Sequence, residues 1–190
     1  MSRSYPSFID ELPLTRQALE FAAEHHRGQQ RDADRAPFIL HPLEVAQLLR
    51  ECGSSDQVIA AGVLHDVLED TDVERDQLRR QFGDEVARLV AGVTEPDDTS
   101  AYAERKAKLR SRVAEAGEES MLIYAADKVA KTRELRIGLV RSDDAGPPAQ
   151  KLEHYWASLA MLERRLPEHP LVHQLRFELE TLELLPPTGG

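Results

Sequence analysis

Apolar residues recur every three to four positions along most of this chain, and short polar segments rich in Gly, Pro and Asp separate these periodic stretches. Such spacing is typical of amphipathic helices that each bury one face. It predicts helices over residues 14–30, 43–50, 58–71, 72–82, 84–93, 101–116, 118–139, 150–166 and 170–185. Because no convincing run alternates as a half-buried strand does, we expect an all-α fold.

Turn and cap residues mark the ends of these segments. Pro37 and Pro42 bracket a short piece that we expect to be extended and to deliver His41, with Pro42 in the first turn of the next helix. Ser55 or Asp56 is expected to cap the helix that follows. The polar stretches 95–100 and 143–148 are expected to be loops, and 186–190 a frayed tail.

The stretch 58–71, VIAAGVLHDVLEDT, places polar residues inside the most apolar predicted helix. His65, Asp66, Glu69 and Asp70 have Val and Leu on either side. Ionised carboxylates are costly to bury without a partner, and a metal cation is the cheapest one. Neighbouring helical residues point about 100° apart, so we expect an ion to lie between His65 and Asp66, with other helices supplying further ligands.

Two residues elsewhere qualify as those further ligands. His41 precedes Pro42, and Asp127 interrupts the otherwise apolar segment MLIYAADKVA. Two imidazoles and two carboxylates suit Mn²⁺, Fe²⁺, Zn²⁺ or Co²⁺, and the lack of thiolates argues against a structural zinc site. One alternative stays open: Asp127 could instead pair with Lys131, four residues on.

For the remaining histidines and the basic residues, structural or solvent-exposed positions are expected instead of metal or substrate binding. His25 and His26 are adjacent and are expected at the surface or at the rim of a pocket. His154, His169 and His173 are expected to be solvated or to cap helices. The basic run at 105–112 alternates with acidic residues and reads as a solvated helix face, one end of which could overhang a pocket.

Composition narrows the class of protein. The 190 residues are 41% hydrophobic, which is enough for one good core and short for two, so one domain spanning 1–190 with a core from about 14 to 185 is expected. A net charge of -10 argues against binding a nucleic-acid polymer, since phosphate backbones require clustered Lys and Arg. The lone Cys52, with no signal-peptide pattern or bilayer-length apolar run, favours a cytoplasmic protein without membrane association.

Four motifs carry a resemblance to a known family. HPLEVA around His41, VLHDVLEDT around His65 and AADK around Asp127, with FAAEHHRGQQR before them, resemble the HD-domain metal-dependent phosphohydrolases. The similarity is greatest to the hydrolase domain of the RelA/SpoT family and its small stand-alone relatives, which remove the 3′-pyrophosphate from the alarmone (p)ppGpp. It implies an HD-type helical bundle, a divalent metal, with Mn²⁺ the expected ion, and a part in the stringent response.

Carried over by position, the resemblance makes His41, His65, Asp66 and Asp127 the metal ligands. It makes the pair Glu69-Asp70 the residues that activate and position the attacking water. In one continuous helix Glu69 would lie one turn beyond His65 on the same face, where it could accept the proton.

The resemblance also implies substrate contacts, and here the chain departs from the family. Arg31 matches a basic substrate-binding position, Tyr155 matches an aromatic position near the nucleotide pocket, and Lys128 is a second phosphate contact by its place after Asp127. The family's next basic residue is replaced by Asp32, and its Asn four residues after the metal-binding Asp is replaced by Lys131. The expected substrate-binding site therefore loses a positive charge at Asp32 and gains one at Lys131.

The sequence thus predicts a stand-alone, divalent-metal-dependent hydrolase of a phosphorylated nucleotide, with (p)ppGpp as the specific substrate expected. One alternative is a phosphatase of the same superfamily for a dNTP, a nucleoside monophosphate or NADPH. Another is an inactive regulatory module that keeps the metal and binds nucleotide without turnover. The intact Glu69-Asp70 pair argues against the inactive module.

Overall fold

A computed structural model describes residues 5–96, 99–141 and 149–184. The expected loop at 143–148 and the tail at 186–190 lie outside these ranges, as do two residues of the predicted loop at 95–100. Within them the only extended pairing is an isolated bridge between Gln30 and Pro37, and all regular structure is helical. The predicted all-α fold is confirmed; the exact domain limits stay a prediction.

The helices follow one another with short connections. Their bounds are η1 (Ser7–Glu11), α1 (Pro13–His25), α2 (Leu40–Glu51), α3 (Asp56–Val63), α4 (Val67–Asp70), α5 (Arg75–Val93), α6 (Tyr102–Ala116), α7 (Glu118–Arg141), α8 (Ala149–Arg165) and α9 (Pro170–Leu184). None of these described helices has the length and apolarity needed to cross a membrane.

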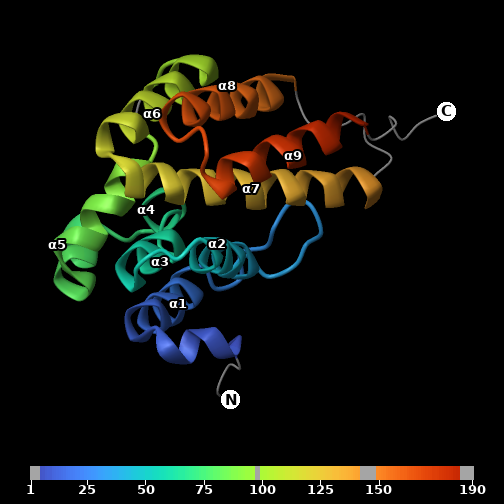
Figure 1. The fold of residues 1–190 in the computed structure, drawn as a ribbon. Helices are drawn as coiled ribbons and strands as arrows, with labels where there is room; N and C mark the ends of the chain where they lie inside the picture. The colour runs from blue at the N-terminus through green and yellow to red at the C-terminus, as the bar shows by residue number, and fades with distance from the viewer. Residues whose placement is uncertain (1–4, 97–98, 142–148, 185–190) are drawn as a thin grey trace.

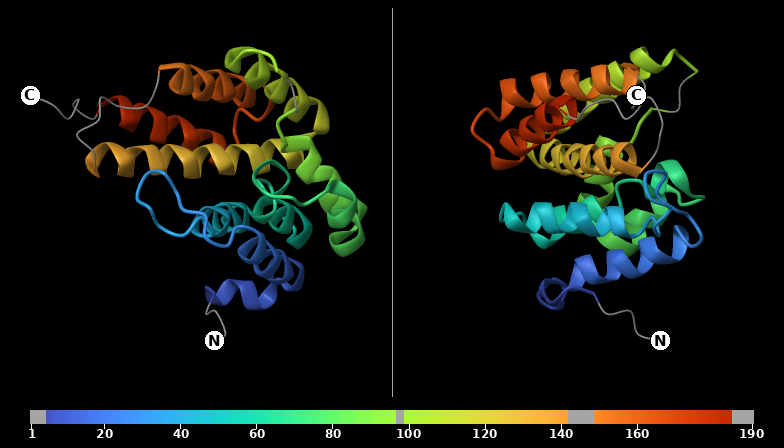
Figure 2. Two further views of the ribbon diagram at one scale, coloured as in Figure 1. Left: turned by 180° about the vertical axis from the view of Figure 1, so that it is seen from behind. Right: turned by 90° about the vertical axis from the view of Figure 1, so that its right-hand side faces the viewer.

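Helix α7 runs through the middle of the molecule, with α1, α2 and α3 on one side and α6, α8 and α9 on the other (Figure 1). It packs directly against α2, α3, α5, α6, α8 and α9, and the two further views agree with this layering (Figure 2). Every residue from Ile123 to Ala130 is buried. A helix buried on all its faces needs apolar residues all round, which explains why this part of α7 reads as a nearly unbroken apolar run.

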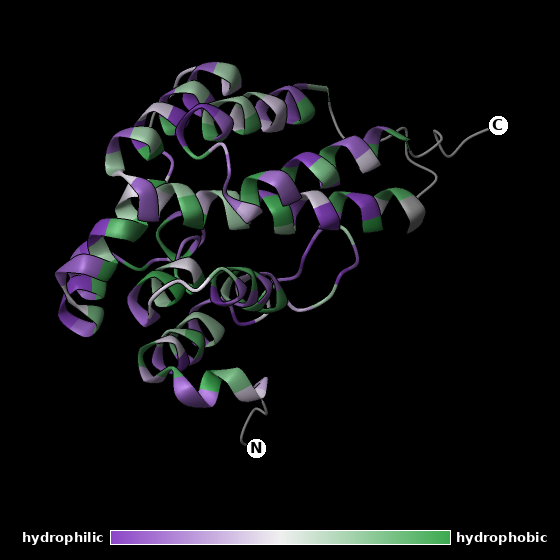
Figure 3. Cartoon of the chain, viewed as in Figure 1, coloured by the Kyte–Doolittle hydropathy of each residue, from purple (hydrophilic) through white to green (hydrophobic). Residues whose placement is uncertain are grey.

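The outer helices carry the amphipathic pattern that their sequences predict. Figure 3 shows hydrophobic and hydrophilic segments alternating along them. Their apolar faces form one core that includes Leu19 of α1, Leu49 of α2, Leu89 of α5, Leu162 of α8 and Leu175 of α9. This core fixes the helices that position the candidate site.

The first helix and the piece before His41 differ from expectation. Helix α1 ends at His25 instead of Gln30, and the chain then turns through Gly28, whose φ of 86° is a left-handed conformation that favours glycine. The piece bracketed by prolines is a turn, not an extended segment, since the His41 amide donates to the Phe38 carbonyl at 2.9 Å. Helix α2 therefore begins at Leu40, and His41 lies in its first turn.

The stretch predicted as one helix over 58–71 is two helices, α3 and α4, separated by a turn at residues 64–66. The His65 imidazole bonds the Gly62 carbonyl through Nδ1 at 2.7 Å. In a continuous helix that carbonyl would accept the amide of residue 66, so the side chain competes with the helical bond. The prediction of a single helix is wrong, although His65 and Glu69 still line the same pocket.

Other predicted helix ends are confirmed. Gly83 has a φ of 87° and divides α5 into two helical pieces where the sequence places a break. Ser55 caps α3, its Oγ accepting the Val58 amide at 3.4 Å. Asp56 instead accepts the amides of Leu14 and Thr15 at 3.0 and 2.9 Å, so it ties the first turn of α1 to the start of α3.

Candidate metal centre

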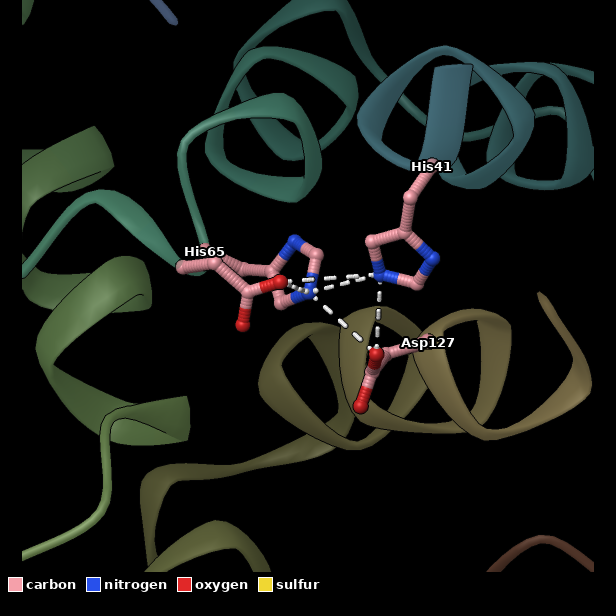
Figure 4. Close-up of side chains that lie close together, drawn as sticks. His41, His65 and Asp127 are labelled. Atoms are coloured by element: carbon pink, nitrogen blue, oxygen red, sulfur yellow. Dashed lines mark hydrogen bonds and ion pairs between the residues drawn. The ribbon is translucent and has the colours of Figure 1, made fainter. Parts of the chain in front are cut away.

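Two histidines and an aspartate from different elements face one another at the contact between α2, the α3–α4 turn and α7 (Figure 4). The Nε2 atoms of His41 and His65 are 3.3 Å apart. Each lies 3.2 Å from Oδ1 of Asp127. Three segments far apart in the sequence thus present polar atoms to one point.

Asp66 completes the cluster. Its Oδ2 lies 3.0 Å from Nε2 of His65 and 3.6 Å from Nε2 of His41. One ligand atom from each of His41, His65, Asp66 and Asp127 falls within 4.8 Å of the other three, and all four residues are buried. The consecutive residues 65 and 66 lie in the turn after α3, and their side chains reach the same point. Their roles as ligands stay a prediction.

Hydrogen bonds behind the cluster fix both imidazoles in the same tautomer. Nδ1–H of His65 donates to the Gly62 carbonyl at 2.7 Å, and Nδ1–H of His41 donates to Oε1 of Glu134 at 2.8 Å. In the neutral rings that a metal would require, both Nε2 lone pairs then point at the centre of the cluster. Metal-binding histidines have this arrangement, in which a carbonyl or carboxylate takes the other ring proton.

Glu134 was not among the residues singled out from the sequence. It lies seven residues after Asp127 on α7, two helical turns along the same face. That spacing was visible in the sequence, but its use depends on α2 packing against α7, which the sequence did not show.

Gly62 lies where α3 approaches α2 closely. A Cβ added there would lie 2.4 Å from Cδ1 of Leu49 and 3.2 Å from Cγ1 of Val45. The missing side chain therefore lets α3 sit close enough to α2 for His65 to meet His41.

The charges of the cluster attract cations. Burial opposes protonation of His65, but the carboxylates of Asp66 and Asp127 outweigh burial and raise its pKa to about 10. Burial likewise opposes ionisation of Asp66, yet His65 and Lys131 keep its pKa below the usual range. The two carboxylates thus remain ionised and draw positive charge to the site.

The donor set fits a divalent cation. Oδ2 of Asp66 is buried and accepts no hydrogen bond of good geometry, although Nε2 of His65 lies 3.0 Å away, and a buried carboxylate oxygen without such a bond is costly. Two imidazole nitrogens and two carboxylates are borderline and hard ligands of the kind that bind divalent transition metals. A cation at the point where they meet would satisfy this oxygen and both lone pairs.

Two lysines of α7 also reach Asp127, on its two different oxygens. Lys128 donates to Oδ2 at 2.6 Å, and its ammonium lies 4.5 Å from the Tyr124 ring centre and 5.6 Å from that of Tyr155. Lys131 lies 3.1 Å from Oδ1. The Asp127–Lys131 pair considered as an alternative is present together with the cluster, so the two interpretations do not exclude each other.

The predicted catalytic pair separates into two environments. Glu69 lines the same pocket as Asp66 and Asp127, where its carboxylate accepts the Glu95 amide and burial raises its pKa. Asp70 is not among the residues that line this pocket; its carbonyl accepts Nε2 of Gln29 at 2.9 Å, and burial raises its pKa too. The catalytic role of both residues stays a prediction.

The predicted substrate contacts are partly engaged with the protein itself. Arg31 pairs with Asp34, and its Nη1 lies 3.8 Å from Oε1 of Glu134. Tyr155 is buried, which raises its pKa to about 12. Of the basic run at 105–112, Lys106 lines the pocket and pairs with Glu95, as expected for an end that overhangs it.

Two histidines correct the expectation of surface positions. His26 is buried and donates from Nδ1 to Oε1 of Gln29 at 2.7 Å. His154 is also buried, Nη1 of Arg110 donates to its Nδ1 at 2.8 Å, and burial together with nearby Lys128 and Lys106 lowers its pKa to about 2. Both lie on inward faces that the sequence pattern did not distinguish from the surface.

His169 and His173 agree with expectation. His169 accepts the Leu171 amide at the start of α9, and His173 is exposed.

Comparisons with known proteins place the chain in a family. The family model described as HD domain matches residues 18–160. Guanosine-3′,5′-bis(diphosphate) 3′-pyrophosphohydrolase MESH1 of Danio rerio is 37% identical over 147 residues, covering 75% of this chain and 79% of the relative. The Homo sapiens MESH1 is 36% identical with the same coverage.

A solved structure has a similar fold. It is described as a metazoan ortholog of SpoT that hydrolyses ppGpp and plays a role in starvation responses. It superposes with a TM-score of 0.76 at 26% identity and covers 96% of this chain and 100% of its own. A GTP pyrophosphokinase of Streptomyces coelicolor is 36% identical over 169 residues, but this chain spans only 19% of its length.

Proposed function

The chain belongs to the HD domain family and is a metal-dependent phosphohydrolase, and we propose that it removes the 3′-pyrophosphate from guanosine 3′,5′-bis(diphosphate). The observation that carries the proposal is the buried convergence of His41, His65, Asp66 and Asp127, with Glu69 on the wall of the same pocket. The small relatives, which this chain covers over most of their length, are named for this activity, and that supports the choice of substrate.

In this proposal each residue has a chemical task. His41, His65, Asp66 and Asp127 would hold the cation, and Gly62 and Glu134 would keep the two imidazoles aimed at it. A divalent cation would supply Lewis-acid activation of water and of the phosphoryl oxygens.

Glu69 would take the proton of the water that attacks the 3′-phosphorus. Its raised pKa suits a base that must accept a proton near neutral pH, and the Glu95 amide holds its carboxylate in place. The bond from phosphorus to the ribose 3′-oxygen would then break, and that oxygen would leave as the 3′-hydroxyl with the proton that Glu69 had taken. Pyrophosphate would be released, and the lysines beside the pocket would offset negative charge on the phosphoryl oxygens.

The finer assignments also belong to this proposal. Mn²⁺ is the proposed ion, because a mixed nitrogen and oxygen donor set suits it and such a cation tolerates open positions for water and substrate. Asp70, Arg31, Lys128 and Tyr155 keep the roles given to them from the family resemblance, and Lys131, which replaces the family's Asn, is proposed as a further phosphate contact. Action in the cytoplasm and in the stringent response is part of the same proposal.

A nucleotide panel tests the substrate. The purified protein, supplied with Mn²⁺, is incubated separately with ppGpp, a dNTP, a nucleoside monophosphate and NADPH, and the released pyrophosphate and orthophosphate are measured. We expect pyrophosphate release from ppGpp to exceed every other activity. Orthophosphate release from another nucleotide, with ppGpp intact, would assign a different substrate, and binding without turnover across the panel would assign a regulatory module.

A further inference from the structure

Lys131 makes an unusual contact for a residue beside a metal site. Its ammonium lies 3.1 Å from Oδ1 of Asp127 and 3.5 Å from Oδ1 of Asp66. Oδ1 of Asp127 is also the atom that faces Nε2 of both His41 and His65 at 3.2 Å. The lysine therefore binds the carboxylate oxygen that points into the cluster.

A lysine in this position competes with a metal ion. A dication bound to Oδ1 of Asp127 and an ammonium 3.1 Å from the same oxygen would be only a few ångströms apart. Two like charges at such a distance repel strongly in a partly buried site. Either the lysine weakens metal binding, or it moves away when the metal arrives.

Lys131 has room to move, whereas Lys128 does not. The Lys131 side chain is 33% exposed and lines the pocket together with Glu69 and Lys106. Lys128 is 5% exposed, contacts the other oxygen of Asp127, and lies beside the rings of Tyr124 and Tyr155. Lys128 thus holds Asp127 permanently, and Lys131 can exchange partners.

The next partner for a displaced Lys131 would be an anion in the pocket. Few protein groups can take it up: Lys128 and Lys151 are close enough to repel it, and Glu95 already pairs with Arg105 and Lys106. The Glu69 carboxylate, which lines the same pocket, already accepts the Glu95 amide. A phosphoryl group that enters the pocket would bring the negative charge that Lys131 loses when a metal takes Asp127.

We propose that Lys131 couples the two binding events: it neutralises Asp127 and Asp66 before metal binds, and metal binding releases it to pair with the phosphoryl oxygens of the substrate. The inference rests on the metal centre of the proposed function. By linkage, the metal must then strengthen anion binding and the anion must strengthen metal binding by the same factor through this lysine.

Metal titration without nucleotide tests the first half. The chelator-treated wild type, Lys131→Gln and Lys131→Arg are titrated with Mn²⁺ in competition with an indicator dye. We expect Lys131→Gln to bind Mn²⁺ about tenfold more tightly than the wild type, since a competing charge is gone, and Lys131→Arg to resemble the wild type. Lys108→Gln removes an exposed positive charge that pairs with Glu104 on α6, and it controls for net charge.

Inorganic phosphate tests the second half. Its affinity is measured with and without Mn²⁺, with its weak binding to free Mn²⁺ subtracted. The metal should improve phosphate binding about threefold more in the wild type than in Lys131→Gln, where no ammonium is released. Thermal unfolding gives a separate readout: Lys131→Gln should melt below the wild type without metal and gain more on adding Mn²⁺.

The outcomes separate this inference from the proposed function. His41→Ala should weaken Mn²⁺ binding both in the otherwise wild-type protein and in combination with Lys131→Gln. If it does, and wild type and Lys131→Gln bind Mn²⁺ equally, the lysine does not compete and the inference is wrong while the metal centre stands. If His41→Ala binds Mn²⁺ as the wild type does, the metal binds elsewhere and both fail.

Discussion

The two sides of the pocket differ in how firmly their residues are held. On the metal side, His41, His65 and Asp127 are buried, and each has a partner that fixes its orientation. Among the residues expected to contact substrate, Lys131 on the pocket wall is partly exposed, whereas Arg31, which does not line this pocket, is paired with Asp34. A metal must be held at one geometry, whereas a flexible phosphate chain can be met by side chains that exchange partners.

The largest effect should come from removing a carboxylate of the metal side. We expect Asp127→Ala to abolish both metal retention and hydrolysis, because Oδ1 of Asp127 faces both imidazoles. Metal content of the purified variant and turnover of ppGpp measure the two losses. An active Asp127→Ala enzyme would contradict the ligand assignment.

A change at Glu69 should separate chemistry from metal binding. Glu69→Gln keeps the size of the side chain and removes the base, so kcat should fall about 10²–10⁴-fold while metal content stays that of the wild type. Asp70→Asn makes the matched change at the other residue of the predicted pair, which does not line the pocket, and a smaller loss of kcat is expected there. Loss of metal in Glu69→Gln would show that Glu69 contributes to metal binding and not only to proton transfer.

The partner behind His41 should matter less than the ligand itself. Glu134→Gln replaces a carboxylate acceptor with an amide, which weakens its hold on Nδ1–H of His41. Metal affinity should fall about 10–100-fold, the usual cost of losing such a partner. Affinity within twofold of the wild type, measured by dye competition, would show that Glu134 does not orient the ring.

The smallest effect should appear on the substrate side. Arg31→Gln should raise KM about tenfold, the cost of one charge-assisted hydrogen bond, and leave metal affinity unchanged. Arg31 also lies 3.8 Å from Glu134, the partner of His41, so its removal could affect the metal site instead of the substrate. Weaker metal binding with an unchanged KM would mean that Arg31 acts through Glu134 and His41.

The sequence predicted the metal cluster better than its surroundings. Its four residues stand in motifs whose apolar neighbours make burial evident, so their types and positions pointed to one site. The break at residues 64–66 could not be predicted from periodicity, because Leu64 and Val67 continue the helical pattern and only the bond from His65 to Gly62 interrupts it.

The rest of the site depended on packing between helices. Glu134 and Glu95 are ordinary acidic residues in the sequence and gain their roles only where α2 meets α7 and where the segment after α5 meets Glu69. The burial of His154 follows in the same way from α8 facing α6. Contacts between residues this far apart in the chain leave no local pattern to read.

The central position of α7 has a consequence for the lifetime of the protein. Asp127 lies midway along this helix, and the residues it faces come from the opposite layer, so a cation held there would brace one half of the molecule against the other. Ligands that bind only the native state shift the unfolding equilibrium in its favour. In a metal-starved cell we therefore expect proteases to remove this enzyme faster, so that metal supply would set its abundance as well as its activity.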